Sequence, residues 1–408
     1  MDIDDTPEEA AFRAEARAWL DAHAIPRGHP DDFSLGMWTG AYDEDTYIAR
    51  CQEWQATLYD GGWAGITWPK EYGGRGGKPI ENVIFGQEQA NYGVSNGALM
   101  ISVGMAGPTL LAHGSDAQRD ELLPPLLRGD ELWCQLFSEP GAGSDLAALA
   151  TRAERDGDEW VVNGQKVWTS SPTRARWGML LARTDPDVPK HKGISWFVLD
   201  MAAPGIDIRP LRQMTGESHF SEIFLDDVRI PADRVVGAPG EGWGVAQTTL
   251  TSERSSIAGG VGATPQALAA FARRFGVNDE PLVRQRLVDA HIRFELLRFL
   301  RYRSQTALSQ GRRAGPEASV MKLAFARYMQ ALTATAVDLQ GAHGLLGGGD
   351  VVDDGMWLRR FLHSPSLRIA GGSDQVQANI MGERALGLPS EPRSDKDVPF
   401  RELAGGPR

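Results

Sequence analysis

The sequence is poor in the residue types on which several classes of protein depend. Its 408 residues include only two cysteines, Cys51 and Cys134, which form neither a CxxC pair nor part of a ligand cluster. We therefore expect neither a disulfide framework nor a metal site. Acidic residues outnumber basic ones, and the formal net charge of -12 argues against nucleic acid or an anionic membrane surface as the main partner.

Long hydrophobic runs are also missing. No stretch of 18 apolar residues occurs, and the acidic first residues, Met1 to Asp5, carry no apolar signal core. We therefore expect a cytoplasmic protein. A chain of this length can bury a sizeable core and is expected to divide into two or three domains.

What the sequence does contain changes character along the chain. Residues 1–130 are predicted to be helical, and Thr6 to Glu9 fit a capping box with proline at the first helical position. Residues 131–240 carry two tight-turn signals, Asp156-Gly157 and Asn163-Gly164, between short apolar segments, and this pattern predicts a β-meander. The face that the first helix would bury consists of Phe12, Ala16, Trp19 and Leu20.

The helical period returns at about residue 241 and lasts to about residue 386. The sequence therefore predicts an α+β protein with an N-terminal α-helical domain (1–130), a middle β domain (131–240) and a C-terminal helical bundle (241–390). Residues 391–408 are polar and contain proline and glycine, so they are predicted to be a loose tail.

Two short segments indicate a ligand site. Ser138 to Asp145 reads Ser-Glu-Pro-Gly-Ala-Gly-Ser-Asp, and its proline and glycines suppress regular structure, so that backbone N–H groups and small hydroxyls can approach a ligand closely. Trp168-Thr169-Ser170 places a flat ring beside two hydroxyls. Together these segments predict a shelf for a planar cofactor with a phosphate tail.

The order of domains and these motifs resemble the acyl-CoA dehydrogenase family from about Glu8 to Pro389. Ser138 to Asp145 is similar to the family signature Thr-Glu-Pro-Gly-Ala-Gly-Ser-Asp. The resemblance implies N-terminal helices, a middle β-barrel and a C-terminal four-helix bundle. It also implies FAD as cofactor, an acyl-CoA thioester as substrate, α,β-dehydrogenation, electron transfer flavoprotein as oxidant and an oligomeric assembly.

The resemblance also implies roles for individual residues near FAD. Trp168 would cover the flavin face away from the substrate, and Ser170, next to Thr169, would hydrogen-bond near N5. Otherwise Trp168 is a residue of the barrel core and Ser138 a turn residue. Gly143 and Ser144 would lie near the pyrophosphate or the CoA arm. The residues expected along the isoalloxazine are Gln135, Phe137 and Ser138.

The residue that removes the α-proton departs from the commonest family pattern. Many members have a glutamate before Gly-Thr-Ser, and Gly371 occupies that place here, so it cannot accept a proton. Glu253 is the alternative, because it fills the missing position of an apolar helical stripe and desolvation there would raise its pKa. A structural ion pair is the other interpretation of Glu253. The stripe consists of Trp243, Ala246, Leu250, Ile257 and Val261.

Subfamilies that resemble the isovaleryl- and long-chain enzymes carry their base at such a Glu-Arg dipeptide. Arg254 would then reach the CoA arm, or else would be a surface or interface charge. A backbone N–H near Gly371 and Gly372 would hydrogen-bond the thioester carbonyl. Gly371 in place of a glutamate is expected to widen the pocket floor and to favour branched or bulky acyl groups, and fatty acids and sterol side chains both lie within the family's range.

Further positions that the resemblance assigns to FAD come from the C-terminal helices. The family's Arg-x-x-Phe-Gly segment has Ala272 where its arginine is expected, so Arg273 or Arg274 would have to substitute beside Phe275. Arginines between Arg284 and Arg303 do not share one face, which favours a solvated or subunit-facing role over a phosphate patch. The remaining FAD positions are Gln340, Gly344, Ser373 and Gln375.

Two alternative functions keep the fold. Some bacterial relatives form mixed α2β2 assemblies in which one chain keeps the base and its partner contributes only architecture, and this chain could be the architectural partner. A second alternative is an oxygen-using flavin oxidase or monooxygenase. In the architectural partner Glu253 would be a relic or an ion pair, and the complete flavin shelf together with Glu253 argues against that role. The monooxygenase alternative does not explain a carboxylate on the buried stripe.

Overall fold

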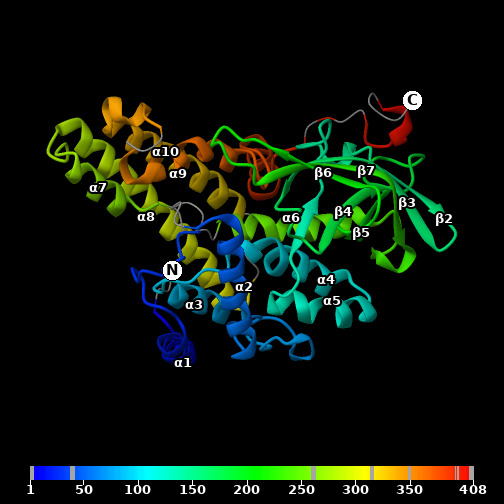
Figure 1. Cartoon of the computed structure of the whole chain (residues 1–408), viewed down its shortest axis with the longest axis horizontal. Coiled ribbons are helices and arrows are strands. Elements are labelled where there is room, and N and C mark those ends of the chain that lie inside the picture. The colour runs from blue at the N-terminus through cyan, green and yellow to red at the C-terminus, as the bar shows by residue number, and fades with distance from the viewer. Residues whose placement is uncertain are drawn as a thin grey trace. The chain divides into compact units, whose positions relative to one another are not determined.

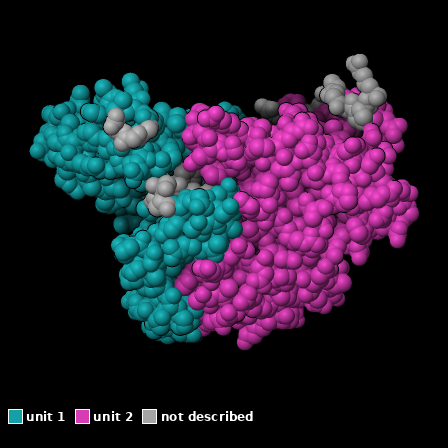
Figure 2. All heavy atoms as spheres, viewed as in Figure 1, with its two compact units in different colours: residues 1–50, 77–95, 254–389 teal, residues 51–76, 96–253, 390–408 magenta. Residues whose placement is uncertain are grey.

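The computed structural model describes residues 4–36, 42–258, 263–312, 317–347, 351–390, 392 and 395–403. The chain forms two compact units, coloured separately in Figure 2. Unit 1 comprises residues 1–50, 77–95 and 254–389, and unit 2 comprises residues 51–76, 96–253 and 390–408. Each unit has its own hydrophobic core, so we describe them one at a time.

Unit 1 is helical (Figure 1). Its core forms around Phe271, Tyr328, Leu332 and Trp357. No helix in the described part of the chain is both long and apolar enough to cross a bilayer. Its helices are α1 (Pro7–His23), α3 (Pro79–Gln89), α7 (Pro265–Arg274), α8 (Pro281–Ser309), α9 (Glu317–Leu339), α10 (Met356–His363) and α11 (Asp374–Ile380), while α2 (Glu44–Asp60) and α6 (Gly242–Ala258) contribute residues to both units.

The first helix begins where its sequence predicts. The Thr6 hydroxyl accepts a hydrogen bond from the Glu9 N–H, and the Glu9 carboxylate accepts one from the Thr6 N–H, which completes the capping box. Phe12, Ala16 and Leu20 are buried as expected. Trp19 is half-buried and stacks on the ring of His23 at 4.4 Å.

Unit 2 contains one eight-stranded sheet in the order β6-β7-β3-β2-β4-β5-β8, with β1 paired in parallel to β4 (Figure 1). Helices α4 (Gly107–His113) and α5 (Asp116–Arg128) precede the sheet. The strands are β1 (Trp133–Leu136), β2 (Arg152–Asp156), β3 (Glu159–Ser170), β4 (Trp177–Arg183), β5 (Ile194–Asp200), β6 (Ile206–Leu211), β7 (Phe220–Pro231) and β8 (Val235–Val236).

Strand β4 is buried on both faces because the sheet has a core on each side. Trp177 and Met179 face a core shared with the helices, whereas Leu180 faces the other core with residues of β3 and β7. Side chains alternate along a strand. Gln135 of β1 therefore shares the helix-covered side with Trp133.

The predicted turn at Asn163-Gly164 is wrong. These residues lie inside β3, at a register shift of its pairing with β7. Gly164 is needed there because a Cβ would come within 2.4 Å of the Thr151 hydroxyl. Asn163 bonds Asp227 through both its amide and its carbonyl, at 2.9 and 3.0 Å. The other signal, Asp156-Gly157, does lie at a β-hairpin, between β2 and β3.

The described part of the C-terminal segment belongs to unit 2 and packs on the β domain, in contrast to the loose tail that we expected. Phe400 is buried, and the Arg183 guanidinium lies over its ring at 3.6 Å. The Asp395 carboxylate contacts the Lys190 ammonium at 2.7 Å, and the Phe400 N–H donates to the Val188 carbonyl. The segment thereby covers the loop between β4 and β5.

We expect Phe400→Ala to lower the free energy of unfolding by about 3 kcal/mol, because it removes a buried ring and leaves a cavity over Arg183. Urea denaturation would measure the change. Arg401→Ala is the matched control: it breaks only a surface ion pair with Asp187 and should change stability by less than about 0.5 kcal/mol. Equal stability of the Phe400 variant and the wild type would contradict the packing role.

Candidate active site

The glycine-containing loop is a tight turn after β1. Glu139 and Ala142 exchange two backbone hydrogen bonds of 3.0 Å, which close the turn around Pro140 and Gly141. A Cβ on Gly141 or Gly143 would meet nothing within 4 Å, and neither glycine has a positive φ. The protein's own packing therefore does not require glycine at these two positions, and the open space beside them is available to a ligand.

A buried ion pair holds this loop in place. The Glu139 carboxylate contacts the Lys166 ammonium of β3 at 2.8 Å and accepts hydrogen bonds from the N–H groups of Ala150 (2.7 Å) and Thr151 (2.9 Å). Lys166 is fully buried and also donates to the Phe137 carbonyl at 3.1 Å. The two side chains thus tie together three segments of backbone, at residues 137–139, 150–151 and 166.

Burial and pairing act in opposite directions on both members of this pair. Burial lowers the pKa of Lys166 below its ordinary 10.5, and the charge and hydrogen bond of Glu139 oppose that effect. Burial by itself raises the pKa of Glu139, but the Lys166 charge and the hydrogen bonds from Lys166, Thr151 and Ala150 lower the pKa below its ordinary 4.5. Burial also lowers the pKa of Arg183, to about 10. Arg183 donates to the carbonyls of Ala147 and Leu149, so it fixes the continuation of the loop.

Trp168 lies at a strained position at the end of β3. Its φ is 64°, a left-handed conformation that is unusual for a bulky residue, and 61% of its surface is exposed. Its ring meets the Phe220 ring edge-on at 6.1 Å. Thr169 is buried, and none of the residues that the structure describes bonds its hydroxyl, whereas Ser170 is half-buried.

Glu253 lies on the buried face of α6. Gly242, Val245, Ala246 and Thr249 are the buried positions of this helix, and Glu253 follows Thr249 by four residues, so it continues the same face. The buried face of α6 is therefore shifted around the helix from the predicted stripe, and Trp243 and Leu250 of that stripe are half-buried at the edge of the buried face. Val261 lies outside the described residues, as does the side chain of Ile257.

The Glu253 carboxylate is half-buried and has a polar neighbour in the sheet. The Gln135 amide of β1 donates to its Oε2 at 3.3 Å. Phe137, two residues after Gln135, is buried in the core, so its backbone rather than its ring is available to a ligand. Ser138 is half-buried and its carbonyl accepts from the Val167 N–H, while Ser144 is exposed.

The other expected site residues belong to unit 1. Gly371 and Gly372 both have positive φ, 66° and 93°, and their carbonyls accept hydrogen bonds from two buried side chains, Gln377 at 3.0 Å and Lys322 at 2.6 Å. The Ser373 hydroxyl caps α11 by accepting from the Val376 N–H. Gln375 is exposed and Arg254 is half-buried.

Four further residues expected to contact FAD lie at the end of α7 and just after α9, and they differ in exposure and in partners. Arg274 is exposed and forms an ion pair with Asp353, and the Phe275 ring packs on Phe271 at 5.0 Å. The Gln340 amide donates to the Ala336 carbonyl. Gly344 is required by packing, since a Cβ would lie 2.7 Å from the Val337 carbonyl.

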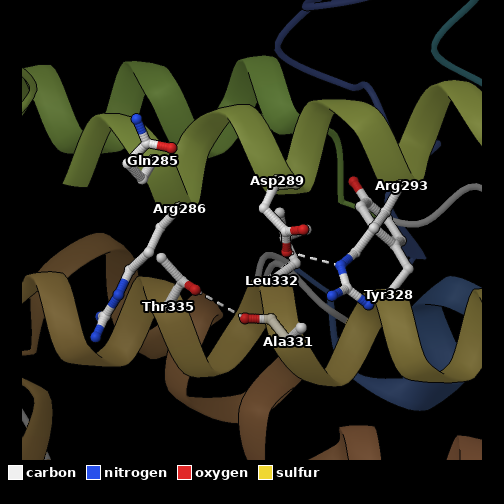
Figure 3. Close-up of a pocket in the computed structure, with 9 residues that line it drawn as sticks. Gln285, Arg286, Asp289, Arg293, Tyr328, Ala331, Leu332 and Thr335 are labelled. Atoms are coloured by element: carbon white, nitrogen blue, oxygen red, sulfur yellow. Dashed lines mark hydrogen bonds and ion pairs between the residues drawn. The ribbon is translucent and has the colours of Figure 1, made fainter. Parts of the chain in front are cut away.

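A hollow of about 380 Å³ between α8 and α9 carries arginines but is not a phosphate site (Figure 3). Arg293 pairs with Asp289 at 2.7 Å, within the hollow. Arg286, also at its edge, pairs with Asp338 at 3.0 Å. Each of these two charges thus already has a carboxylate partner.

Unit 2 fits a planar cofactor with a phosphate tail. The open space beside Gly141 and Gly143 suits the close approach of a phosphate or ribityl chain. Trp168 offers an exposed ring, and among the described residues the buried Thr169 hydroxyl has no hydrogen-bond partner of its own. A buried polar atom of this kind calls for a ligand or water.

Helices, a β domain and further helices, with this loop between β1 and β2, define an enzyme of the acyl-CoA dehydrogenase type. Three family models cover most of the chain: the acyl-CoA dehydrogenase N-terminal domain (residues 6–130), middle domain (134–228) and C-terminal domain (240–386). The chain belongs to the acyl-CoA dehydrogenase family, whose members typically bind FAD, and it is an acyl-CoA dehydrogenase. The predicted family and fold class are confirmed.

Two mycobacterial proteins and one solved structure illustrate the similarity. The chain is 43% identical to acyl-CoA dehydrogenase FadE34 of Mycobacterium tuberculosis. The matched region covers 82% of this chain but only 46% of FadE34. It is 38% identical to acyl-CoA dehydrogenase IpdE1 of the same species, over 93% of this chain and 98% of IpdE1. The steroid ACAD Tcur3481-Tcur3483 has a TM-score of 0.80 at 30% identity, over 96% of this chain and all of the solved one.

Sequence reasoning missed Lys166 and Arg183, which hold the loop from Ser138 to Asp145 and its continuation to Leu149. A signal existed for Lys166, because alternation along the strand places it on the same face as the apolar Trp160 and Val162. A lysine on the buried side of a strand requires an acidic partner. No comparable signal exists for Arg183, whose backbone acceptors are specified by tertiary structure alone.

We expect Glu139→Gln to lower the free energy of unfolding by about 3–5 kcal/mol, because it leaves the Lys166 ammonium buried without a counter-charge. The double variant Glu139→Gln with Lys166→Met should recover much of this loss. Guanidinium denaturation of the three proteins measures both effects. A double variant as unstable as the single one would contradict the pairing.

The same pair predicts a loss of stability in acid. The folded state holds the pKa of Glu139 below 4.5, so the pair stabilises the fold fully above that pH, and its contribution is lost as the pH falls from 4.5 through the lower folded pKa. The thermal midpoint of the wild type should therefore fall more steeply below pH 4.5 than that of the double variant. Parallel curves would contradict the assignment.

Proposed function

We propose that the protein is an FAD-dependent dehydrogenase that converts an acyl-CoA thioester to the trans-2-enoyl-CoA, with Glu253 as the base. The observation that carries the proposal is a half-buried carboxylate on the buried face of α6, within hydrogen-bond reach of the Gln135 amide. Such a position disfavours a solvated ion pair and suits proton abstraction. Gly371, where many relatives have a glutamate, cannot take this role.

In this proposal the chain's residues bind and orient the reactants. Glu253 accepts the α-proton of the acyl group on a carboxylate oxygen. Trp168 covers the cofactor ring and excludes water, while Thr169 and Ser170 offer hydroxyls beside it. FAD, when bound, supplies the acceptor at N5 for the hydride that leaves the β-carbon, and electron transfer flavoprotein is the proposed oxidant.

The substrate is proposed to be a bulky acyl-CoA. A backbone N–H at Gly371 or Gly372 would hydrogen-bond the thioester carbonyl and acidify the α-carbon, and Arg254 would bind the CoA arm. The absence of a side chain at Gly371 favours a branched or sterol-derived acyl group. The similarity to a solved steroid ACAD supports this substrate class.

A heteromeric assembly with a sister subunit is proposed for the same enzyme. Two positions support it: Ala272 stands where the family's FAD-contacting arginine is expected, and Arg274 is already paired with Asp353. The solved relative named for two chains, Tcur3481-Tcur3483, supports it as well. A purely architectural role for this chain is the second candidate, and it does not account for Glu253.

We expect the purified protein, alone or with its sister chain, to be yellow and to be bleached anaerobically by a suitable acyl-CoA. Glu253→Gln should slow flavin reduction by about 10²–10⁴-fold, because it removes the base, and should leave FAD bound. Stopped-flow absorbance with butyryl-, isovaleryl-, octanoyl- and steroid-CoA thioesters measures the rate.

Glu241→Gln provides the matched control, since Glu241 is an exposed carboxylate just before α6 and should not affect the rate. Undiminished reduction in the Glu253 variant would rule out Glu253 as the base. A variant that loses its FAD would show instead that Glu253 serves the cofactor site.

Native mass spectrometry tests the assembly. We expect this chain to bind FAD fully only when it is co-expressed with a sister acyl-CoA dehydrogenase subunit, in a complex containing both chains. The family's arginine reaches the FAD of a neighbouring subunit, and Ala272 stands in its place here, so a sister chain would have to supply that contact. A homo-oligomer that carries one FAD per chain would contradict the heteromeric proposal.

A further inference from the structure

We propose that Gln135 is a positioning residue that orients Glu253 and sets the strength of this base. The inference rests on the proposed function, because it gives Gln135 a role only if Glu253 removes the α-proton. The observation is the hydrogen bond of 3.3 Å from the Gln135 Nε2 to the Glu253 Oε2. Both residues belong to unit 2, Gln135 in β1 and Glu253 in the part of α6 that this unit contains.

Strand β1 is a rigid support for the amide. Gln135 pairs in parallel with Met179 of β4, and its neighbours Cys134 and Leu136 are fully buried. The strand is anchored at its start by the Trp133 N–H, which donates to the Ser102 hydroxyl at 2.9 Å. A side chain on such a strand can be held to the small positional tolerance that a catalytic group needs.

Helix α6 is equally fixed where it leads to Glu253. At its start, a Cβ on Gly242 would lie 2.5 Å from the Ser195 backbone, so the helix begins in direct contact with β5. One turn before Glu253, the Thr249 hydroxyl meets the Thr109 hydroxyl of α4 at 2.9 Å. The 3.3 Å contact is therefore defined by two anchored backbones.

An amide suits this place better than a charged donor. Its N–H stabilises the carboxylate form of Glu253 and opposes the effect of burial, while its neutrality avoids the large loss of basicity that a lysine or arginine contact would cause. A carboxylate has about four lone-pair sites, so one amide hydrogen bond leaves acceptor capacity for a proton. Gln135 would thus keep Glu253 ionised and still basic.

The neighbouring segments of unit 2 carry the ionisable groups His113 and Glu131, and each has a partner of its own. From α4, His113 contacts the Thr248 hydroxyl at 2.8 Å, and burial lowers the pKa of His113. From the segment before β1, Glu131 accepts from the Trp177 indole. Arg254 is the neighbour of Glu253 on α6 itself. Neither β1 nor β4 contributes an ionisable side chain at the contact, because its residues there are Gln135 and Met179.

The test is the pH dependence of flavin reduction in Gln135→Met, which keeps the length of the side chain and removes the donor. We expect the acid limb of the pH–rate profile to move to higher pH by about one unit, because Glu253 without the amide donor stays protonated to higher pH. The plateau rate should also fall about tenfold, because the carboxylate is no longer held in position. Difference infrared titration, with Glu253→Gln as the reference, should show the same shift of the carboxyl midpoint without substrate.

Two controls separate this role from the loss of any neighbouring titrating group. His113→Gln removes the imidazole of α4 that contacts α6, and Glu131→Gln removes the carboxylate that accepts from the Trp177 indole; both should leave the acid limb in place. If Glu253→Gln abolishes reduction but Gln135→Met leaves the limb and the carboxyl midpoint unmoved, the inference is overturned and the proposed base stands. If Glu253→Gln reduces the flavin normally, the proposed function itself fails.

Discussion

The ion pair between Glu139 and Lys166 is the constraint on which the candidate site depends. A lysine that is fully buried in a strand is tolerated only beside a counter-charge, and the counter-charge sits in the cofactor loop itself. The carboxylate also accepts hydrogen bonds from the N–H groups of Ala150 and Thr151, just before β2, and the Lys166 ammonium donates to the Phe137 carbonyl, just after β1. The ion pair therefore fixes the loop at both of its ends. The glycines beside it can then stay open without letting the loop collapse.

The candidate site combines rigidly supported residues with one residue in a strained conformation. Anchored backbone carries Gln135 and Glu253, the groups proposed to handle the proton. Trp168 is held instead in a left-handed conformation and remains largely exposed. Strain of this kind persists only where the surrounding structure over-determines it. The long pairing of β3 with β7 on either side of Trp168 provides that support.

Local signals predicted the fold well, and contacts between distant segments limited the prediction. The capping box could be recognised in the sequence because its partners, Thr6 and Glu9, lie three residues apart. Asn163-Gly164 misled because its glycine serves a close approach to Thr151, which belongs to another segment. The approach of Gln135 to Glu253, 118 residues later, leaves no periodic trace in the sequence. Which acyl group is bound depends on such long-range placements as well.

The cover over the β4–β5 loop has a consequence for how the protein is made. Arg183 and Lys190 are synthesised long before their partners Phe400 and Asp395. During translation Lys190 can already pair with Asp145, whereas its contact with Asp395 and the packing of Arg183 on Phe400 form only after the C-terminal segment has been made. The β domain is therefore completed only at the end of synthesis, although its strands are made in the middle of the chain.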